Sequence, residues 1–166
     1  MKNKGFTMAE VLIASLVALF TFSSTIYTFI MLQKFWRGGN TQIALQSTAR
    51  IAMEHIIRKV RPALEAQVYN NGNGIALRLD PNGTQTQSDD IWCHYEVSNN
   101  RMVYIPNAAA PVPETILENV YQKTGSNIFS TDGSNVVIMF EVRDPSGLFG
   151  HKGTYMESAA TLRNEE

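Results

Sequence analysis

Cysteine is nearly absent from this sequence, and so are several features that would point to particular classes of protein. Cys93 is the only cysteine among 166 residues, so the chain cannot form an internal disulfide and must depend on its hydrophobic core. Cys93 alternates with apolar neighbours, and we expect a buried thiol that behaves as a small hydrophobic residue. The formal net charge is −1 without a basic stripe, so the sequence does not indicate a nucleic-acid partner.

A catalytic or metal-binding set of side chains is also missing. The three histidines are scattered along the chain without the spacing of metal ligands: His55, His94 and His151. Cys93 and His94 would project from opposite faces of a strand, which argues against a nucleophile paired with a base. We therefore predict no enzymatic activity, no cofactor and no metal site.

A calcium loop is the one alternative to this prediction that stays open. The segment 80–84, with Asp89 and Asp90 nearby, offers oxygen ligands and a glycine turn. Its spacing differs from that of an EF-hand loop, and the order Asp-Pro-Asn-Gly is ordinary turn chemistry. Whether calcium binds is left open.

Charge is missing from residues 11–33, which form the longest apolar run of the chain. A helix rises about 1.5 Å per residue, so this run is long enough to cross a hydrocarbon core of roughly 30 Å. The segment 34–37 then combines two cations with two aromatic residues, as at a membrane interface. We predict a transmembrane helix over residues 6–37. The run is too long for the apolar core of an ordinary secretory signal, which has about 7–15 residues.

The segment before the apolar run has a distinctive order of residues. A Lys-Gly pair ends at Gly5, Phe6 and Thr7 follow, and Glu10 lies four residues after Phe6. This pattern closely resembles the leader of type IV pilins and type II secretion pseudopilins. The resemblance implies that residues 1–5 are a leader, that a prepilin peptidase cuts between Gly5 and Phe6, and that the new terminus at Phe6 is methylated. An uncleaved signal anchor is the alternative.

The same resemblance implies a location and a set of partners. The leader would lie in the cytoplasm, with a single span of the inner membrane and a head domain outside the cytoplasm. The positive-inside rule does not test this orientation, because cations flank the apolar run on both sides. The implied partners are other pilin or pseudopilin subunits, the prepilin peptidase and an assembly platform in the membrane.

Glu10 is the carboxylate at the head of the apolar run. A charge in or beside a membrane span costs about 2.5–3.5 kcal/mol on insertion scales, so its presence suggests a function. Under the family resemblance, Glu10 docks subunits by neutralising the free amine of Phe6 on a neighbouring subunit, so that only processed subunits fit. The alternative is a carboxylate in the headgroup region, near a helix N-terminus that favours negative charge.

Residues 38–166 are predicted to form one globular domain that begins with a helix. Gly38 and Gly39 predict a bend or local unwinding, because each glycine costs about 1 kcal/mol relative to alanine in a helix. An amphipathic helix is predicted over 40–66, with Pro62 limiting its regular part. Its apolar stripe recurs at spacings of three and four residues: Leu45, Ala49, Ala52, Met53, Ile56 and Val60.

After Val68 the apolar period changes from helical to two, which is typical of strands. The predicted strands cover 75–79, 91–97, 102–105, 115–121, 127–131, 136–143 and 154–162. Asn99-Asn100 predicts a two-residue hairpin turn, because asparagine tolerates positive φ. The strongest strand would place four apolar side chains on one face: Val136, Ile138, Phe140 and Val142.

Together these elements predict an α+β fold, in which a long N-terminal helix, transmembrane in its first half and amphipathic in its second, packs on an antiparallel sheet. The last strands and the ending Leu162-Arg163-Asn164 resemble the minor pilin and J-type pseudopilin branch. We expect a structural subunit that enters or primes a type IV pilus or a type II secretion pseudopilus. The alternative is a membrane-anchored extracytoplasmic binding module or an adhesive minor pilin.

Overall fold

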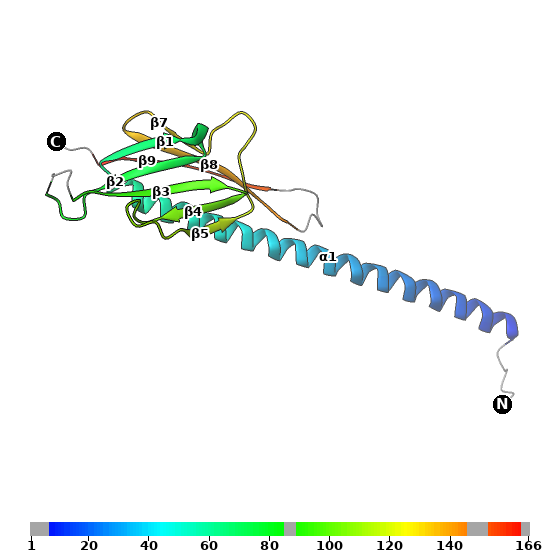
Figure 1. Ribbon diagram of the computed structural model, residues 1–166. Helices are drawn as coiled ribbons and strands as arrows, with labels where there is room; N and C mark the ends of the chain where they lie inside the picture. The colour runs from blue at the N-terminus through cyan, green and yellow to red at the C-terminus, as the bar shows by residue number, and fades with distance from the viewer. Residues whose placement is uncertain (1–6, 85–88, 146–152, 164–166) are drawn as a thin grey trace. The chain divides into compact units, whose positions relative to one another are not determined.

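The computed structural model describes residues 7–84, 89–145 and 153–163, which form one long helix followed by antiparallel strands (Figure 1). The fold is α+β, as predicted. The strands are β1 (Glu65–Tyr69), β2 (Gly74–Leu79), β3 (Ile91–Ser98), β4 (Arg101–Ile105), β5 (Glu114–Glu118), β6 (Val120–Tyr121), β7 (Phe129–Thr131), β8 (Asn135–Arg143) and β9 (Gly153–Thr161). Two compact units divide the chain, residues 1–40 and residues 41–166.

The helix α1 (Met8–Val60) contributes to both units. In the second unit its buried side chains are Ala49, Ala52, Met53, Ile56 and Val60, and Leu45 packs against them while partly buried. The predicted apolar stripe is therefore confirmed. It is the face of the helix that the head domain covers.

The structure contradicts the local unwinding predicted at Gly38 and Gly39 and the helix end predicted at residue 66, while a bend at the two glycines stays a prediction. The helix continues through Gly38 and Gly39 without the expected unwinding, because the weak propensity of two glycines does not outweigh the cooperative hydrogen bonding of a long helix. The helix also ends at Val60 rather than 66. Pro62 lacks an N–H, and after it the Ala63 N–H donates to the Val60 carbonyl in a tighter turn at 3.0 Å.

The chain leaves the helix directly into the first sheet. The Leu64 N–H donates to the Arg78 carbonyl at 2.9 Å, and β1 then pairs with β2 along its whole length. The strand β1 was not among the predicted strands. Its side chains are mostly half-buried, so the strand has no clear alternation between apolar and polar residues.

The first sheet has the order β1-β2-β3-β4-β5, with every neighbouring pair antiparallel. The turn between β3 and β4 has φ values of 51° at Asn99 and 60° at Asn100, as a type I′ hairpin requires. This confirms the predicted turn. The register shifts between Met102 and Val103, where β4 meets β5.

The second sheet is built around β8, which pairs with β9 on one side and with β6 and β7 on the other. The strand predicted over 115–121 is in fact two strands in two sheets. Asn119 has a φ of 58° and separates β5 in the first sheet from β6 in the second. The polar residue with positive φ turns the chain from one sheet to the other.

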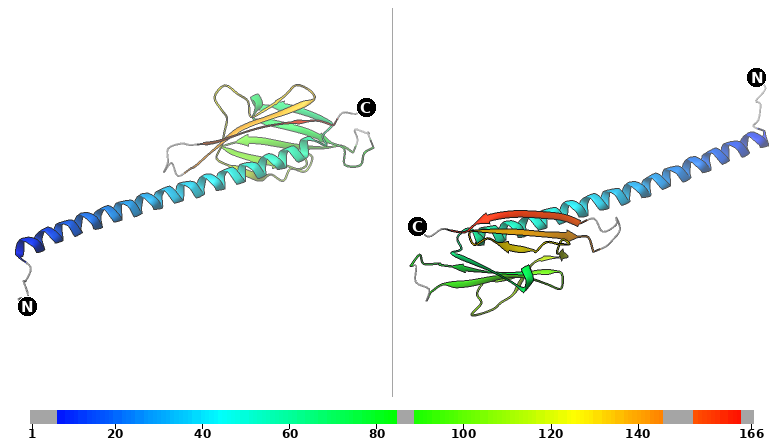
Figure 2. Two further views of the ribbon diagram at one scale, coloured as in Figure 1. Left: turned by 180° about the vertical axis from the view of Figure 1, so that it is seen from behind. Right: turned by 90° about the horizontal axis from the view of Figure 1, so that it is seen from above.

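A hydrophobic cluster joins the second half of α1 to both sheets. All four predicted inward residues of β8 are buried: Val136, Ile138, Phe140 and Val142. The largest buried side chains are the rings of Tyr95, Phe129 and Phe140. Figure 2 shows the second half of α1 lying along the strands of the head domain. The head domain thus has a core that needs no disulfide.

Candidate functional site

The beginning of α1 is the first candidate site, and Glu10 lies in its first turn. The Thr7 hydroxyl accepts a hydrogen bond from the Glu10 N–H at 3.3 Å. In return, Glu10 Oε2 accepts hydrogen bonds from the Thr7 N–H and from the Thr7 hydroxyl, both at 2.9 Å. This is a capping box, with Thr7 before the helix and Glu10 at its third position.

The capping box gives Glu10 a defined geometry. Among the described residues, the hydrogen bonds that Glu10 accepts end on Oε2, so Oε1 is left for another donor. The order Thr-x-x-Glu is visible in the sequence, although the capping box was not among the predicted features. Gly5 and Phe6, the predicted cleavage and methylation positions, lie outside the described residues.

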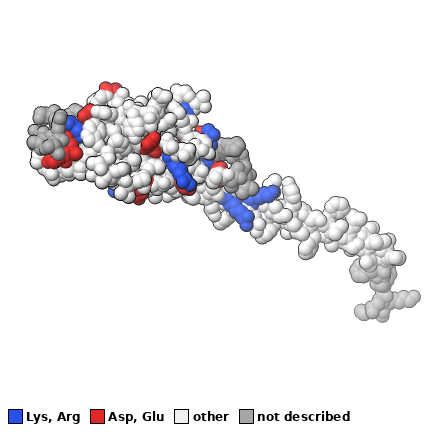
Figure 3. Space-filling view, in the orientation of Figure 1, with Lys and Arg blue, Asp and Glu red and all other residues white. Residues whose placement is uncertain are grey.

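The second feature of the site is the apolar surface that follows Glu10. In the part of the chain that the structure describes, α1 is the one helix long and apolar enough to cross a membrane, by length and composition. Its large apolar side chains from Met8 to Trp36 are all exposed, with Leu12 at 61% and Phe20 at 69%. On the face drawn in Figure 3, this part of α1 shows no acidic side chain, and its only basic side chains are two blue groups near its end. The chain therefore has a helix compatible with one membrane span.

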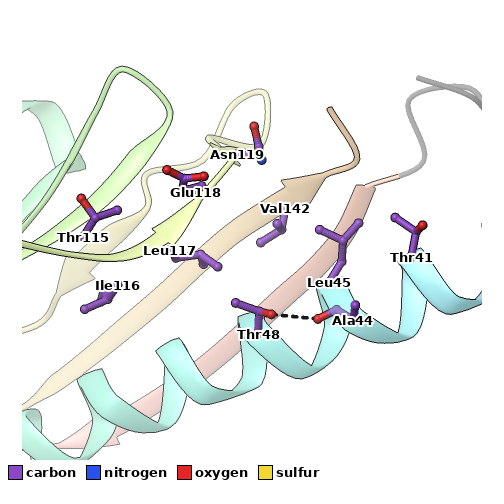
Figure 4. Close-up of a pocket in the computed structure, with 10 residues that line it drawn as sticks. All are labelled: Thr41, Ala44, Leu45, Thr48, Thr115, Ile116, Leu117, Glu118, Asn119 and Val142. Atoms are coloured by element: carbon purple, nitrogen blue, oxygen red, sulfur yellow. Dashed lines mark hydrogen bonds between the residues drawn. The ribbon is translucent and has the colours of Figure 1, made fainter. Parts of the chain in front are cut away.

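A groove of about 440 Å³ lies in the head domain between α1 and the strands β5 and β8 (Figure 4). On the helix side it is lined by Thr41, Ala44, Leu45 and Thr48. The Thr48 hydroxyl donates to the Ala44 carbonyl at 2.9 Å, so the helix satisfies this polar group internally. Leu45, Ile116 and Val142 give the groove an apolar lining. Thr115, Glu118 and Asn119 add polar groups on the strand side.

A small aromatic cluster surrounds His55. The His55 ring lies edge-on to Tyr104 at 4.9 Å between centroids, and its Nδ1 is 3.1 Å from the Tyr95 hydroxyl. Burial, and then the nearby Lys59 charge, lower the pKa of His55 from its ordinary value of 6.5. Because Tyr95 is completely buried, its hydroxyl needs this partner. The cluster is part of the packing between α1 and the first sheet.

Cys93 and His94 do not form a reactive pair. Cys93 is completely buried, and this burial raises the pKa of its thiol to about 11. His94 follows it on β3 and packs against Tyr69, with ring centroids 5.8 Å apart. A thiol with this pKa is almost entirely protonated at neutral pH, so it is a poor nucleophile.

The candidate calcium loop uses its first carboxylate to hold a turn. Asp80 Oδ1 accepts hydrogen bonds from the N–H groups of Asn82 at 3.1 Å, Gly83 at 2.6 Å and Thr84 at 3.3 Å. Asp89 Oδ2 accepts from the Thr84 hydroxyl at 2.7 Å. Within residues 7–84, 89–145 and 153–163, no three His, Cys, Asp or Glu side chains gather closely enough to hold a metal ion.

No protein-family model, no curated protein and no solved structure matches this chain. Its own residues must therefore carry any functional inference. Two features are available: the capped Glu10 before an exposed apolar helix, and a head domain with an apolar groove.

Proposed function

We propose that this protein is a minor pilin or pseudopilin, a structural subunit that enters or primes a type IV pilus or type II secretion pseudopilus after prepilin peptidase cleavage. The observation that carries the proposal is the continuous helix α1. Its first part exposes apolar side chains behind Glu10, and its second part is built into the core of a head domain. A subunit of this form is anchored in the inner membrane before assembly, with its head outside the cytoplasm.

The exposed apolar part of α1 needs a covering in the cell. Burying a large apolar side chain is worth about 1.5–3 kcal/mol, and most side chains between Met8 and Trp36 are of this kind. A bilayer supplies such a covering before assembly. The apolar helices of neighbouring subunits supply it afterwards, which is why one helix serves both states.

Glu10 is then the group that recognises an incoming subunit. Cleavage after Gly5 exposes the amine of Phe6, and Glu10 Oε1 would accept a hydrogen bond from this amine while Oε2 stays bonded to Thr7. A buried ion pair adds little net stability because both charges lose their hydration, but a carboxylate left there without a partner is strongly destabilising. Cleaved subunits would therefore dock in register, and uncleaved ones would not.

Two substitutions at Glu10 separate docking from helix capping. Glu10→Gln keeps an oxygen that accepts the Thr7 hydrogen bonds but removes the charge, and Glu10→Ala removes both. We expect both variants to lose incorporation into filaments by at least about tenfold, since truncating one partner of a buried ion pair costs about 3–5 kcal/mol. The measurement is the amount of subunit in sheared or purified filaments, relative to the amount in the membrane.

The control for this experiment is Thr7→Ala, which weakens the cap while retaining the carboxylate. It should lower incorporation much less than Glu10→Gln does. Normal incorporation of Glu10→Gln would show that the charge has no docking role. Mass spectrometry of the assembled subunit tests the rest of the proposal: a methylated terminus at Phe6 is expected, and an intact terminus at Met1 would contradict it.

The groove beside α1 favours a second candidate function, a membrane-anchored extracytoplasmic binding module or adhesive minor pilin. A cleft of about 440 Å³ with an apolar lining is suited to a ligand side chain. Deleting the protein and imaging the cells separates the two candidates. Loss of filaments supports assembly or priming, whereas normal filaments with lost adhesion support the binding module.

A further inference from the structure

The strand β9 is an edge strand, and its second edge has no strand partner within the described parts of the chain. It pairs with β8 over its whole length, from Gly153 opposite Arg143 to Thr161 opposite Asn135. Such an edge presents a row of unpaired backbone N–H and C=O groups, which can pair with a strand of another chain.

The register of the sheet shows which backbone groups point outward. The Leu162 N–H donates to the Ser134 carbonyl at 2.8 Å, which extends the register of β9 on β8 by one residue. Because hydrogen-bonded pairs alternate in an antiparallel ladder, the even-numbered residues of β9 bond to β8. The Met139 N–H donates to the Ile128 carbonyl on the opposite side of β8. The odd-numbered residues of β8 therefore bond away from β9, which agrees with this alternation. The outward-facing residues are therefore Tyr155, Glu157, Ala159 and Thr161.

This edge lacks the usual protection against pairing. Natural edge strands are kept apart by short length, proline, lysine or a bulge. The edge strand β5 has five residues and a shifted register beside Met102, and β1 is equally short. By contrast, β9 has nine residues in unbroken register, without proline or lysine, and its one charged side chain is Glu157.

A symmetric pair of two β9 strands would bring like charges together. The strand β9 runs from Gly153 to Thr161, so antiparallel pairing of two copies over the whole strand is centred on Glu157. The Glu157 side chains of the two copies would then lie directly opposite each other, which is destabilising.

The other edges of a second copy are also poor partners, because β6 and β7 have only two and three residues and the remaining two edge strands are acidic. The strand β1 carries Glu65, and β5 carries Glu114 and Glu118. Pairing either strand with β9 brings these carboxylates toward Glu157, and like charges on paired strands are destabilising. A strand that carries lysine or arginine is favoured instead.

We propose that the open edge of β9 binds an extended strand of a different membrane-anchored subunit, which brings a lysine or arginine side chain to Glu157. Backbone hydrogen bonds from Tyr155, Glu157, Ala159 and Thr161 hold the strand. The identity of the partner as a neighbouring subunit rests on the proposed function.

Amide hydrogen exchange of the full chain tests the pairing directly. The chain is measured once purified in dodecyl maltoside and once in its assembled complex. We expect the outward amides of Glu157 and Ala159 to exchange fast in the purified chain and at least about tenfold more slowly in the complex, because pairing protects them. The amides of Ser158 and Ala160 already bond to β8 and should be slow in both states. Equal exchange of the outward amides in both states would overturn the proposal.

A matched pair of variants tests the same edge by charge and bulk. Ala159→Lys adds a cation to the outer row of β9, and Ala110→Lys makes the same change in an exposed loop. We expect Ala159→Lys to lower recovery of the complex by at least about tenfold, and Ala110→Lys by less than about twofold. Glu157→Lys should lower recovery of the complex as much as Ala159→Lys does. Equal melting temperatures in detergent establish that each variant is folded.

Two results would overturn the proposal without touching the proposed function. One is normal assembly of Ala159→Lys and Glu157→Lys in a chain whose terminus is processed at Phe6. The other is a dimer of the purified full chain that Ala159→Lys dissociates, since it would identify a second copy as the partner. An unprocessed terminus at Met1 contradicts the proposed function instead, whatever the state of the β9 edge.

Discussion

At the scale of single residues, the head domain holds titratable side chains whose properties follow from burial. Tyr95 is completely buried, and its hydroxyl lies 3.1 Å from His55 Nδ1. A protonated imidazole is disfavoured there, because burial and the nearby Lys59 and Arg58 charges oppose it more than Glu114 favours it. The neutral ring is therefore part of the folded structure, and its titration affects stability.

We predict that the folded head loses stability as the pH falls below about 6.5, in part through His55. The pKa of His55 is lower in the folded protein than its ordinary value of 6.5, so the unfolded chain binds more protons in this range. The stability that neutral His55 contributes is fully present above pH 6.5 and is lost as the pH falls through the pKa of His55 in the folded protein. Urea unfolding between pH 7.5 and 5 measures it, and His55→Gln should give a flatter pH dependence. An unchanged slope in His55→Gln would contradict the assignment.

At the scale of elements, the turn between β3 and β4 depends on two consecutive residues with positive φ. We predict that Asn100→Val lowers the free energy of unfolding by about 1–2 kcal/mol, since the left-handed conformation costs that much for a residue with a bulky Cβ. Asn100→Gly should be neutral or slightly stabilising, because Asn-Gly suits a type I′ turn. Denaturant midpoints at constant slope provide the measurement. Equal losses in both variants would mean that the asparagine side chain, not its backbone conformation, is important.

The two faces of α1 allow a second element-scale prediction with an internal control. Ile56 is completely buried against the sheets, whereas Ile51 on the same helix is 66% exposed. Ile56→Ala should cost about 2–5 kcal/mol, through lost transfer energy and a cavity. Ile51→Ala should change stability by less than about 0.5 kcal/mol, as is usual for surface substitutions. Comparable losses in the two variants would contradict the packing of the Ile56 face of α1 against the sheets.

At the scale of the whole molecule, the division into two units suggests that the head domain is independent of the apolar segment. We predict that a chain starting at Thr41 folds and stays soluble without detergent, because its core is formed by residues after that point. The full chain should require detergent or membrane. Circular dichroism and sedimentation of both chains are the measurements. Aggregation of the shorter chain would show that the head needs the first part of α1.

The sequence by itself determined the elements whose signal is local. Hydrophobic periodicity follows directly from which face of an element is covered by apolar groups and which faces water. This is why the sequence alone indicated the uncharged run 11–33, the stripe from Leu45 to Val60 and the alternation in β8. The Asn99-Asn100 turn was predictable because its backbone conformation selects particular residue types. The capping box of Thr7 and Glu10 was equally local, and it was readable from the pattern although our predictions omitted it.

Only the tertiary structure decided how these elements combine. β1 has no clear alternation, because both of its faces are partly covered, and it became a strand through pairing with β2. Asn119 divides the predicted strand 115–121 between two sheets, since β4 and β8 offer separate edges to its two halves. The groove beside α1 and the open edge of β9 likewise arise from residues far apart in the chain. Which edges stay unpaired depends on long-range contacts, which no local pattern encodes.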